Sequence, residues 1–219
     1  MSPKLLKGRG LTRLISLMER LRGEDGCPWD RAQTLESLRP FIIEEAYEVV
    51  SAIDRGEAPE IKDELGDLLF QVIFSCRLLE EQGQGDIFEV MEHSVEKMIR
   101  RHPHVFGEES AETPDDVLKR WAEIKKSEAK EKGGKTVHGR LHEVPEAMPS
   151  LMRAHKISSR AAKAGFTWPD IEGVMGKVNE ELGELQEAIK EQDSAAVEEE
   201  LGDLLFTVVN AARFLDVSP

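Results

Sequence analysis

The sequence predicts an all-α protein, and three observations lead to that fold class. Aromatic residues make up only 5% of the 219 residues and charged residues 33%, a balance that suits amphipathic helices better than strands. Apolar residues recur at steps of three and four over residues 42–53 and 61–79, which is the spacing of one helix face. The chain also repeats itself, so the helical pattern of the first half returns in the second.

The repeat is visible in two short stretches that share one offset. Residues 44–48 read Glu-Glu-Ala-Tyr-Glu, and residues 180–184 read Glu-Glu-Leu-Gly-Glu. Residues 64–70 read Glu-Leu-Gly-Asp-Leu-Leu-Phe, and residues 200–206 read the same seven letters. Both pairs are separated by 136 positions, with no insertion between the stretches. The pattern therefore indicates a duplication of one structural unit.

Each repeat is predicted to contain an antiparallel helical hairpin. In the first repeat, residues 55–59 read Arg-Gly-Glu-Ala-Pro, a helix stop followed by a restart. A link this short favours antiparallel packing of the two helices that it joins. The elements predicted after this hairpin are a third helix over residues 86–101, a polar loop over 102–112 and a helix from Thr113 to about Lys130.

Two glycines at 133 and 134, set among charged residues, mark the predicted boundary between the repeats. We expect a first repeat over residues 1–132, a linker over 133–145 and a second repeat over 146–219. The third helix of the first repeat, advanced by 136 positions, would fall beyond Pro219. The second repeat is therefore expected to lack that helix and its basic side chains.

The overall charge excludes some classes of partner. The formal net charge is −14, which repels phosphate backbones and argues against nucleic acid.

No apolar run is long enough for a membrane span, and the first residues lack the apolar core of a signal peptide. Cys27 and Cys76 are isolated, without metal or redox spacing. These features predict a cytoplasmic protein with no membrane partner.

Acidic side chains recur on one face of each hairpin helix. Positions three apart share a face, so Glu45 and Glu48 point the same way. Glu64 and Asp67 do so on the next helix, and the second repeat carries the same quartet as Glu181, Glu184, Glu200 and Asp203. Like charges that face each other must take up protons or bind cations. Because all the ligands are oxygens and neither hairpin contains histidine, Mg²⁺ is predicted, with Mn²⁺ as a substitute, rather than a di-iron centre.

A single Glu-x-x-Glu on a helix usually lies on a solvent-exposed face and binds no metal, which is the alternative to a metal site. Here the quartet occurs twice, with 15 residues between Glu48 and Glu64 and again 15 between Glu184 and Glu200. Gly66 also lies inside a predicted helix, where glycine costs about 1 kcal/mol relative to alanine. The duplication and the unfavourable glycine together favour a metal site.

Two further sets of residues could contact a phosphorylated substrate. Lys97, Arg100 and Arg101 follow one another near the end of the third predicted helix and could clamp phosphate oxygens. Basic residues at a helix C-terminus are also favoured by the helix dipole alone. Trp29 and Trp168 could stack on a base, or could simply pack beside the helical core.

With these motifs assembled, the chain resembles the MazG family of nucleoside triphosphate pyrophosphohydrolases. The family pattern of Glu-Glu-x-x-Glu, a spacer and Glu-x-x-Asp is met in both repeats, and Gly-Cys-Pro-Trp-Asp at 26–30 and Arg-Arg-His-Pro-His-Val-Phe at 100–106 extend the likeness. The resemblance implies an all-α fold of tandem helical-bundle repeats completed by oligomerisation, as a homodimer or higher homo-oligomer. It also implies hydrolysis of (d)NTPs to (d)NMP and pyrophosphate with Mg²⁺, a house-cleaning of the nucleotide pool.

The same resemblance implies roles for individual residues. Both carboxylate quartets would be metal ligands, and Glu44 and Glu180 would orient or deprotonate the attacking water or hold a second ion. Lys177 matches a substrate-contacting lysine of the second repeat, where the first repeat has Phe41. The basic residues of the third helix favour the first repeat as the faster site, whereas Lys177 favours the second.

Two rival functions stay open on the sequence. One is a dedicated pyrophosphohydrolase of the same superfamily, acting on a single substrate such as phosphoribosyl-ATP or dUTP. The other is a non-catalytic nucleotide or metal sensor that keeps the duplication for oligomerisation.

Overall fold

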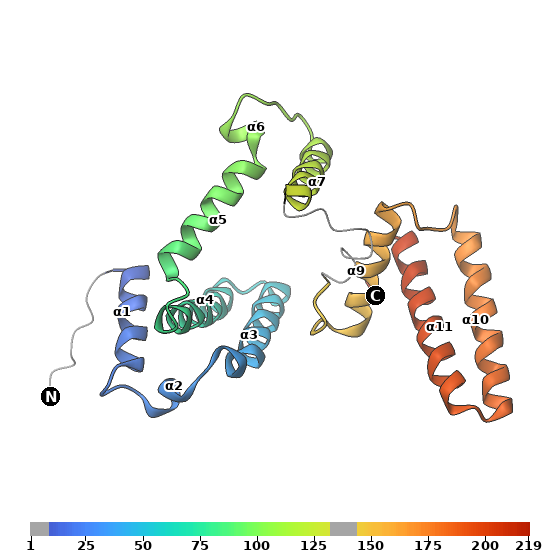
Figure 1. Ribbon diagram of the computed structural model, residues 1–219, viewed down its shortest axis with the longest axis horizontal. Coiled ribbons are helices and arrows are strands. Elements are labelled where there is room, and N and C mark those ends of the chain that lie inside the picture. The colour runs from blue at the N-terminus through green and yellow to red at the C-terminus, as the bar shows by residue number, and fades with distance from the viewer. Residues whose placement is uncertain (1–8, 132–143) are drawn as a thin grey trace. The chain divides into compact units, whose positions relative to one another are not determined.

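The computed structural model describes residues 9–131 and 144–219 (Figure 1). These residues form ten helices and no strand, which confirms the predicted fold class. They divide into two compact units between Trp121 and Ala122. Residues 133–143 of the predicted linker lie outside the described residues, so the boundaries of the repeats stay a prediction.

The first unit is built around one long helical hairpin. Its helices are α1 (Leu11–Arg22), α2 (Pro28–Ala32), α3 (Leu35–Arg55), α4 (Ala58–Glu81), α5 (Ile87–Arg101) and α6 (Pro103–Phe106), and α7 (Pro114–Glu131) crosses the division between the units. Helices α3 and α4 pack along each other, and α1 packs against α4. Met18, Leu38 and Phe74 are almost fully buried between these three helices. The hairpin therefore forms the core of the unit as well as carrying the acidic motifs.

Local sequence signals explain where the hairpin helices begin and end. The Thr34 side chain accepts a hydrogen bond from the Ser37 N–H, and the Ser37 hydroxyl oxygen accepts one from the Thr34 N–H, a capping box that starts α3. Gly56 ends α3 with φ 76°, the left-handed conformation that glycine adopts without strain. Pro59 then lies in the first turn of α4. The predicted helix stop and restart at residues 55–59 is confirmed.

The second unit repeats this hairpin in the same register. Its helices are α9 (Ser150–Lys163), α10 (Ile171–Glu191) and α11 (Ser194–Phe214). The first residues of α3 and α10 are 136 positions apart, as are those of α4 and α11. The capping residues share the offset, because Asp170 caps α10 as Thr34 caps α3, and Gln192 ends α10 with φ 59° as Gly56 ends α3. The sequence repeat is therefore a structural repeat of the hairpin.

The structure also holds elements that the sequence pattern did not predict. Helices α1 and α9 are amphipathic but lie outside the repeated motifs, and α2 has only five residues. The predicted polar loop over residues 102–112 contains the four-residue helix α6, which begins at Pro103. The predicted start of α7 is confirmed, because the Thr113 hydroxyl accepts a hydrogen bond from the Asp116 N–H.

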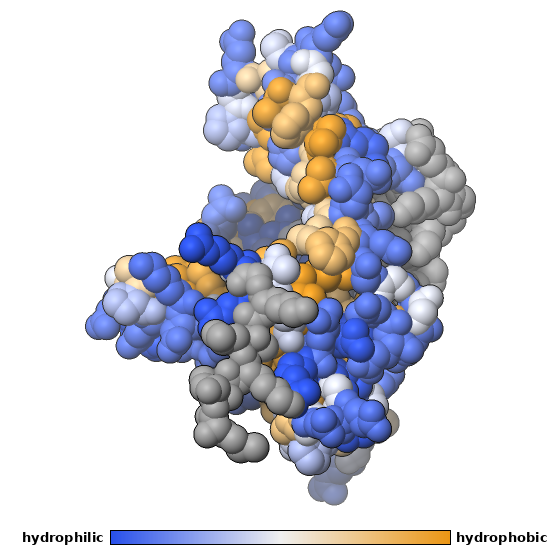
Figure 2. All heavy atoms as spheres, turned by 90° about the vertical axis from the view of Figure 1, so that its left-hand side faces the viewer, coloured by the Kyte–Doolittle hydropathy of each residue, from blue (hydrophilic) through white to orange (hydrophobic). Residues whose placement is uncertain are grey.

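Helix α5 presents an apolar face to solvent. Phe88, Val95 and Ile99 recur at helical spacing and are 44–59% exposed. Figure 2 shows apolar side chains gathered in the upper part of the face that it presents, over α5. Among the described helices, none combines the length and the apolarity that a membrane crossing requires.

Candidate functional site

The hairpin of the first unit brings three of its predicted ligands together. Glu45 and Glu48 from α3 and Glu64 from α4 each offer a carboxylate oxygen, and these oxygens all lie within 4.8 Å of one another. Asp67, one turn further along α4, lies outside this trio, although its charge acts on both Glu45 and Glu64. Of the four carboxylates expected at one point between the facing helices, three come together.

The electrostatics of this first cluster show mutual repulsion. Loss of hydration raises the pKa of Glu45 above its ordinary value, and the charges of Asp67 and Glu48 raise it further, against a hydrogen bond from Gln71. Loss of hydration and the charge of Glu48 likewise raise the pKa of Glu64. The carboxylates thus oppose their own ionisation, as expected where a cation is needed to balance them.

The second unit holds an equivalent cluster with a more buried centre. Glu181 and Glu184 from α10 and Glu200 from α11 place one oxygen each within 4.8 Å of one another. Glu181 is buried, whereas its first-unit counterpart Glu45 is half-buried. Loss of hydration raises the pKa of both Glu184 and Glu200, and the charge of Asp203 adds to the rise at Glu200. Three of the four predicted ligands of the second repeat therefore come together, and Asp203 acts on the cluster through its charge.

A lysine distinguishes the second cluster from the first. The Lys177 ammonium lies 2.7 Å from an oxygen of Glu180 and 2.9 Å from an oxygen of Glu181. Hydrogen bonds to Glu180 and then Glu181 raise the pKa of Lys177, so it stays protonated. The equivalent residue of the first unit, Phe41, packs its ring edge-on to Trp29 with centroids 5.7 Å apart.

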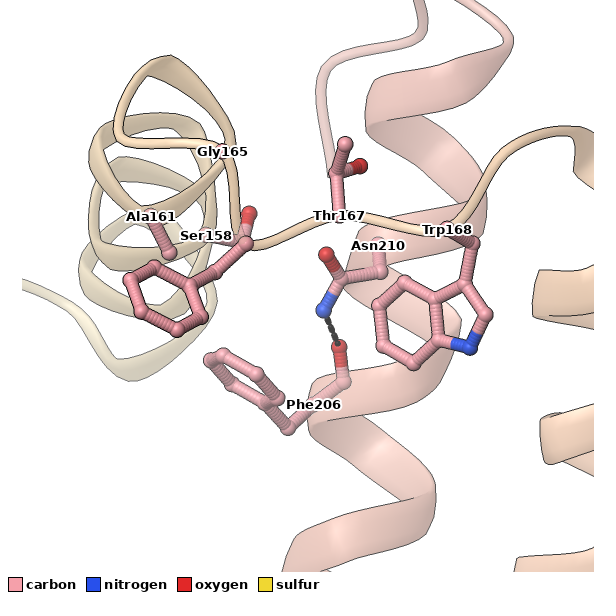
Figure 3. Close-up of a pocket in the computed structure, with 8 residues that line it drawn as sticks. Ser158, Ala161, Gly165, Thr167, Trp168, Phe206 and Asn210 are labelled. Atoms are coloured by element: carbon pink, nitrogen blue, oxygen red, sulfur yellow. Dashed lines mark hydrogen bonds between the residues drawn. The ribbon is translucent and has the colours of Figure 1, made fainter.

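A pocket of about 490 Å³ lies along α11 beyond the second cluster. It is lined from α9, from the loop before α10 and from α11, by Ser158, Ala161, Gly165, Phe166, Thr167, Trp168, Phe206 and Asn210. Figure 3 shows the Trp168 indole and the Phe206 ring around the Asn210 amide. Asn210 Nδ2 donates to the Phe206 carbonyl oxygen at 3.0 Å, which fixes the orientation of the amide. Asp203, Phe206 and Asn210 recur at steps of three and four, so Asp203, whose charge acts on the cluster, shares one face of α11 with the pocket.

The residue that corresponds to Asn210 is different in the first unit. Phe74 lies 136 residues before Asn210 and is buried in the core of the first unit. Asn210 was not among the predicted site residues, although the sequence carries a signal for it: it is a polar residue where the other repeat has a buried phenylalanine. Gln71, which hydrogen-bonds Glu45, was also missed; its counterpart in the second unit is Thr207.

The remaining predicted residues lie outside the two clusters. Glu44 and Glu180 are exposed beside them, and Glu180 pairs with Lys177. Trp29 is 54% exposed against Phe41. The predicted phosphate clamp consists of Lys97, Arg100 and Arg101, which lie in the last turns of α5.

The structure does not bring the α5 clamp to the first cluster within one copy of the chain. Helix α5 leads away from the end of α4 (Figure 1), whereas Glu64 lies in the first two turns of α4. The helix that follows the hairpin therefore starts at the end opposite to the carboxylates. The three basic side chains are part of the first unit but not of its acidic cluster.

The donor set fits a hard divalent ion. Every group in both clusters is a carboxylate oxygen, and hard ions such as Mg²⁺ and Mn²⁺ prefer oxygen ligands and retain bound water. Each cluster also combines a buried or half-buried carboxylate with an exposed one, so an ion held there would still face solvent and a ligand. This arrangement suits binding of a phosphorylated substrate through metal.

Comparison with known proteins agrees with this chemistry. The family model described as the MazG nucleotide pyrophosphohydrolase domain matches residues 33–106 and 170–217, which contain both hairpins. The chain is 47% identical over 206 residues to the nucleoside triphosphate pyrophosphohydrolase/pyrophosphatase MazG of Thermotoga maritima, covering 94% of this chain and 76% of that protein. It is 44% identical over 208 residues to the nucleoside triphosphate pyrophosphohydrolase of Escherichia coli K12, covering 94% and 78%.

The repulsion within the first cluster predicts that Glu48→Gln stabilises the metal-free protein. A carboxyl whose pKa is raised in the folded state lowers the free energy of unfolding of the protein as the pH rises from about 4.5 through that folded pKa. In EDTA at pH 8 we expect the substitution to raise the Tm by about 2–4 °C, and to leave it unchanged near pH 4. Thermal unfolding followed by circular dichroism measures both values.

Glu92 is an exposed residue on α5, so Glu92→Gln is the matched control for removing one negative charge. Added Mg²⁺ should raise the Tm of the parent chain more than that of Glu48→Gln. A lower metal-free Tm in Glu48→Gln would contradict the account, since it would mean that the carboxylates form structural ion pairs.

Proposed function

Because the chain belongs to the MazG family, we propose that it hydrolyses nucleoside triphosphates to nucleoside monophosphates and pyrophosphate. One observation carries the proposal: a carboxylate cluster, a lysine and a pocket follow one another on the same hairpin of the second unit. These are the parts that a metal-bound polyphosphate with an attached base requires. The substrates are ribo- and deoxyribonucleoside triphosphates, and the role is clearance of the nucleotide pool.

The second cluster is the proposed metal site for this reaction. Glu181, Glu184 and Glu200 hold Mg²⁺, or Mn²⁺ in its place, and Asp203 completes the set from the next turn of α11. When bound, the ion neutralises charge on the phosphate oxygens and lowers the pKa of a bound water. The wholly oxygen donor set and the raised carboxyl pKa values support this assignment.

The residues beside the cluster contribute to the transfer itself. Water forms a bond to the α-phosphorus, the bond from that phosphorus to the α–β bridging oxygen breaks, and its electron pair leaves with pyrophosphate. Glu180, exposed next to the cluster, orients the water and accepts its proton. Lys177 stabilises the negative charge that develops on the phosphate oxygens. In the first unit, Glu44 occupies the position of Glu180.

The pocket on α11 is the proposed binding site of the base. Asn210 follows Asp203 by seven positions, a rise of about 10 Å along the helix, which is comparable to the span from a nucleotide's phosphates to its base. A cavity of about 490 Å³ has the size of a small-ligand site. Trp168 provides a ring for stacking, and the oriented Asn210 amide provides polar contacts to the edge of a base.

The second unit is therefore the proposed site of nucleotide turnover. In the first unit, Phe41 replaces Lys177 and Phe74 replaces Asn210, so neither the ammonium nor the amide is present at these positions. The first cluster is proposed to bind a divalent ion through Glu45, Glu48, Glu64 and Asp67, with slower or no turnover. This assignment replaces the expectation that the basic residues of α5 make the first repeat the faster site.

Exposed apolar stripes beside the clusters support self-association. Leu65, Leu69 and Val72 on α4 are 40–48% exposed, and Leu201, Leu205 and Val208 on α11 are 46–50% exposed at the same repeat positions. Burial of such stripes is favourable by roughly 25 cal/mol per Å² of apolar surface. A second copy of the chain is the proposed partner for these stripes.

The reaction is tested by incubating the chain with each nucleoside triphosphate and Mg²⁺ and resolving the products. We expect monophosphate and pyrophosphate, and no turnover in excess EDTA. Glu184→Gln should lower kcat about a hundredfold or more, because it removes a preorganised charge from the reacting phosphates, whereas Glu48→Gln should have a much smaller effect.

Three outcomes would count against the proposal. Diphosphate and orthophosphate as products, or full turnover in EDTA, would refute the reaction. Saturable nucleotide binding without turnover would indicate a sensor instead of an enzyme. Loss of activity in Glu48→Gln alone would refute the assignment of turnover to the second unit.

The oligomer is tested by sedimentation equilibrium of the chain. We expect a mass of at least twice 24.6 kDa, and a shift toward the single-chain mass in Leu205→Asp, because a charge on the stripe cannot be buried without a partner. The exposed Glu198→Gln on the same helix is the control. A parent chain that sediments as one copy at micromolar concentration would contradict self-association.

A further inference from the structure

Lys177 holds the most buried carboxylate of the two clusters. Its ammonium lies 2.9 Å from Glu181 Oε1, and the Glu181 side chain is only 5% exposed. The same ammonium lies 2.7 Å from Glu180 Oε1, on a side chain that is 57% exposed. The lysine therefore bridges an inner carboxylate of the metal cluster and an outer one at its edge.

A carboxylate that is removed from water needs a counter-charge. In the second unit, Lys177 supplies that charge from one turn earlier on the same helix. The first unit cannot do this, because Phe41 stands at the equivalent position and packs on Trp29. There, a neutral hydrogen bond from Gln71 is what opposes the effects of burial and of three neighbouring carboxylates on Glu45. The two clusters share a pattern of carboxylates but differ in how the negative charge of those carboxylates is balanced in the absence of metal.

An ammonium and a divalent ion compete for Glu181. A magnesium ion binds carboxylate oxygens at about 2.0–2.1 Å, and a positive charge already hydrogen-bonded to the same carboxylate repels it. The four-carbon stem of lysine lets the ammonium move without a change in the backbone. Glu180, which the ammonium already contacts at 2.7 Å, can retain it on the exposed side when it leaves Glu181.

We propose that Lys177 is a displaceable counter-ion, which neutralises Glu181 in the metal-free second site and transfers to the nucleotide phosphates when the divalent ion binds. This proposal rests on the proposed function of the second unit. Metal alone must expel the ammonium from Glu181, whereas metal with a nucleotide gives the ammonium a new anionic partner. Metal and nucleotide therefore bind cooperatively at this site, and each raises the affinity for the other by the same factor.

The test measures Mn²⁺ binding by electron paramagnetic resonance of the free ion, with and without an α,β-imido nucleoside triphosphate. The full chain carries Glu45→Gln and Glu48→Gln, so that the second cluster dominates the signal. In that background we expect Lys177→Met to bind Mn²⁺ about tenfold more tightly without nucleotide, and to lose most of the gain that the analogue confers. Lys177→Arg keeps the charge and should bind Mn²⁺ as weakly as the parent.

The first unit offers a converse experiment. In a chain whose second cluster is silenced by Glu184→Gln and Glu200→Gln, Phe41→Lys introduces the lysine beside Glu45. We expect it to weaken Mn²⁺ binding about tenfold, by creating the competition that the second unit has. Phe41→Met is the control for loss of the ring that packs on Trp29.

The results separate this proposal from the proposed function. Unchanged or weaker Mn²⁺ binding in Lys177→Met, with the parent binding normally, would overturn the counter-ion role and leave the metal site standing. Equal gains in Lys177→Met and Lys177→Arg would also overturn it, because they would trace the effect to packing instead of charge. A parent that binds no Mn²⁺, even with the analogue, would overturn the metal site itself and this proposal with it.

Discussion

Repulsion among carboxylates on facing helices is the constraint on which the rest of this structure depends. Glu45, Glu48 and Glu64 converge in one unit and Glu181, Glu184 and Glu200 in the other, and each set gains folding stability only if a cation balances it. The convergence requires the two helices of a hairpin to hold one register. That register is fixed by the helix caps, by the left-handed residue at each turn and by the short links between the helices.

Duplication has kept this register while changing what surrounds it. The helix starts of the two hairpins are 136 positions apart, and the ligand positions follow them. Two substitutions on the same helices change the surroundings: Lys177 stands for Phe41, and Asn210 for Phe74. The first unit gains a closed aromatic core, whereas the second gains a counter-charge and an open pocket. One scaffold thus carries two carboxylate clusters with different surroundings.

The sequence was sufficient to predict the elements whose signals are local. The hairpins, the turn at residues 55–59 and the cap at Thr113 follow from periodicity and turn chemistry, and the structure confirms them. The position of Lys97, Arg100 and Arg101 could not be predicted in this way, because the direction in which α5 leaves α4 is set by tertiary packing. The role of Asn210 was likewise hidden, since lining a pocket depends on how α9 and the loop at Trp168 pack against α11.

The requirement of both carboxylate clusters for a cation is tested by the anomalous scattering of Mn²⁺ in crystals of the chain grown with a nonhydrolysable nucleoside triphosphate. We expect one or more Mn²⁺ peaks bounded by Glu181, Glu184 and Glu200, with a further peak at the equivalent acidic cluster of the first unit. Crystals that hold the nucleotide but show no Mn²⁺ at either carboxylate cluster would contradict it.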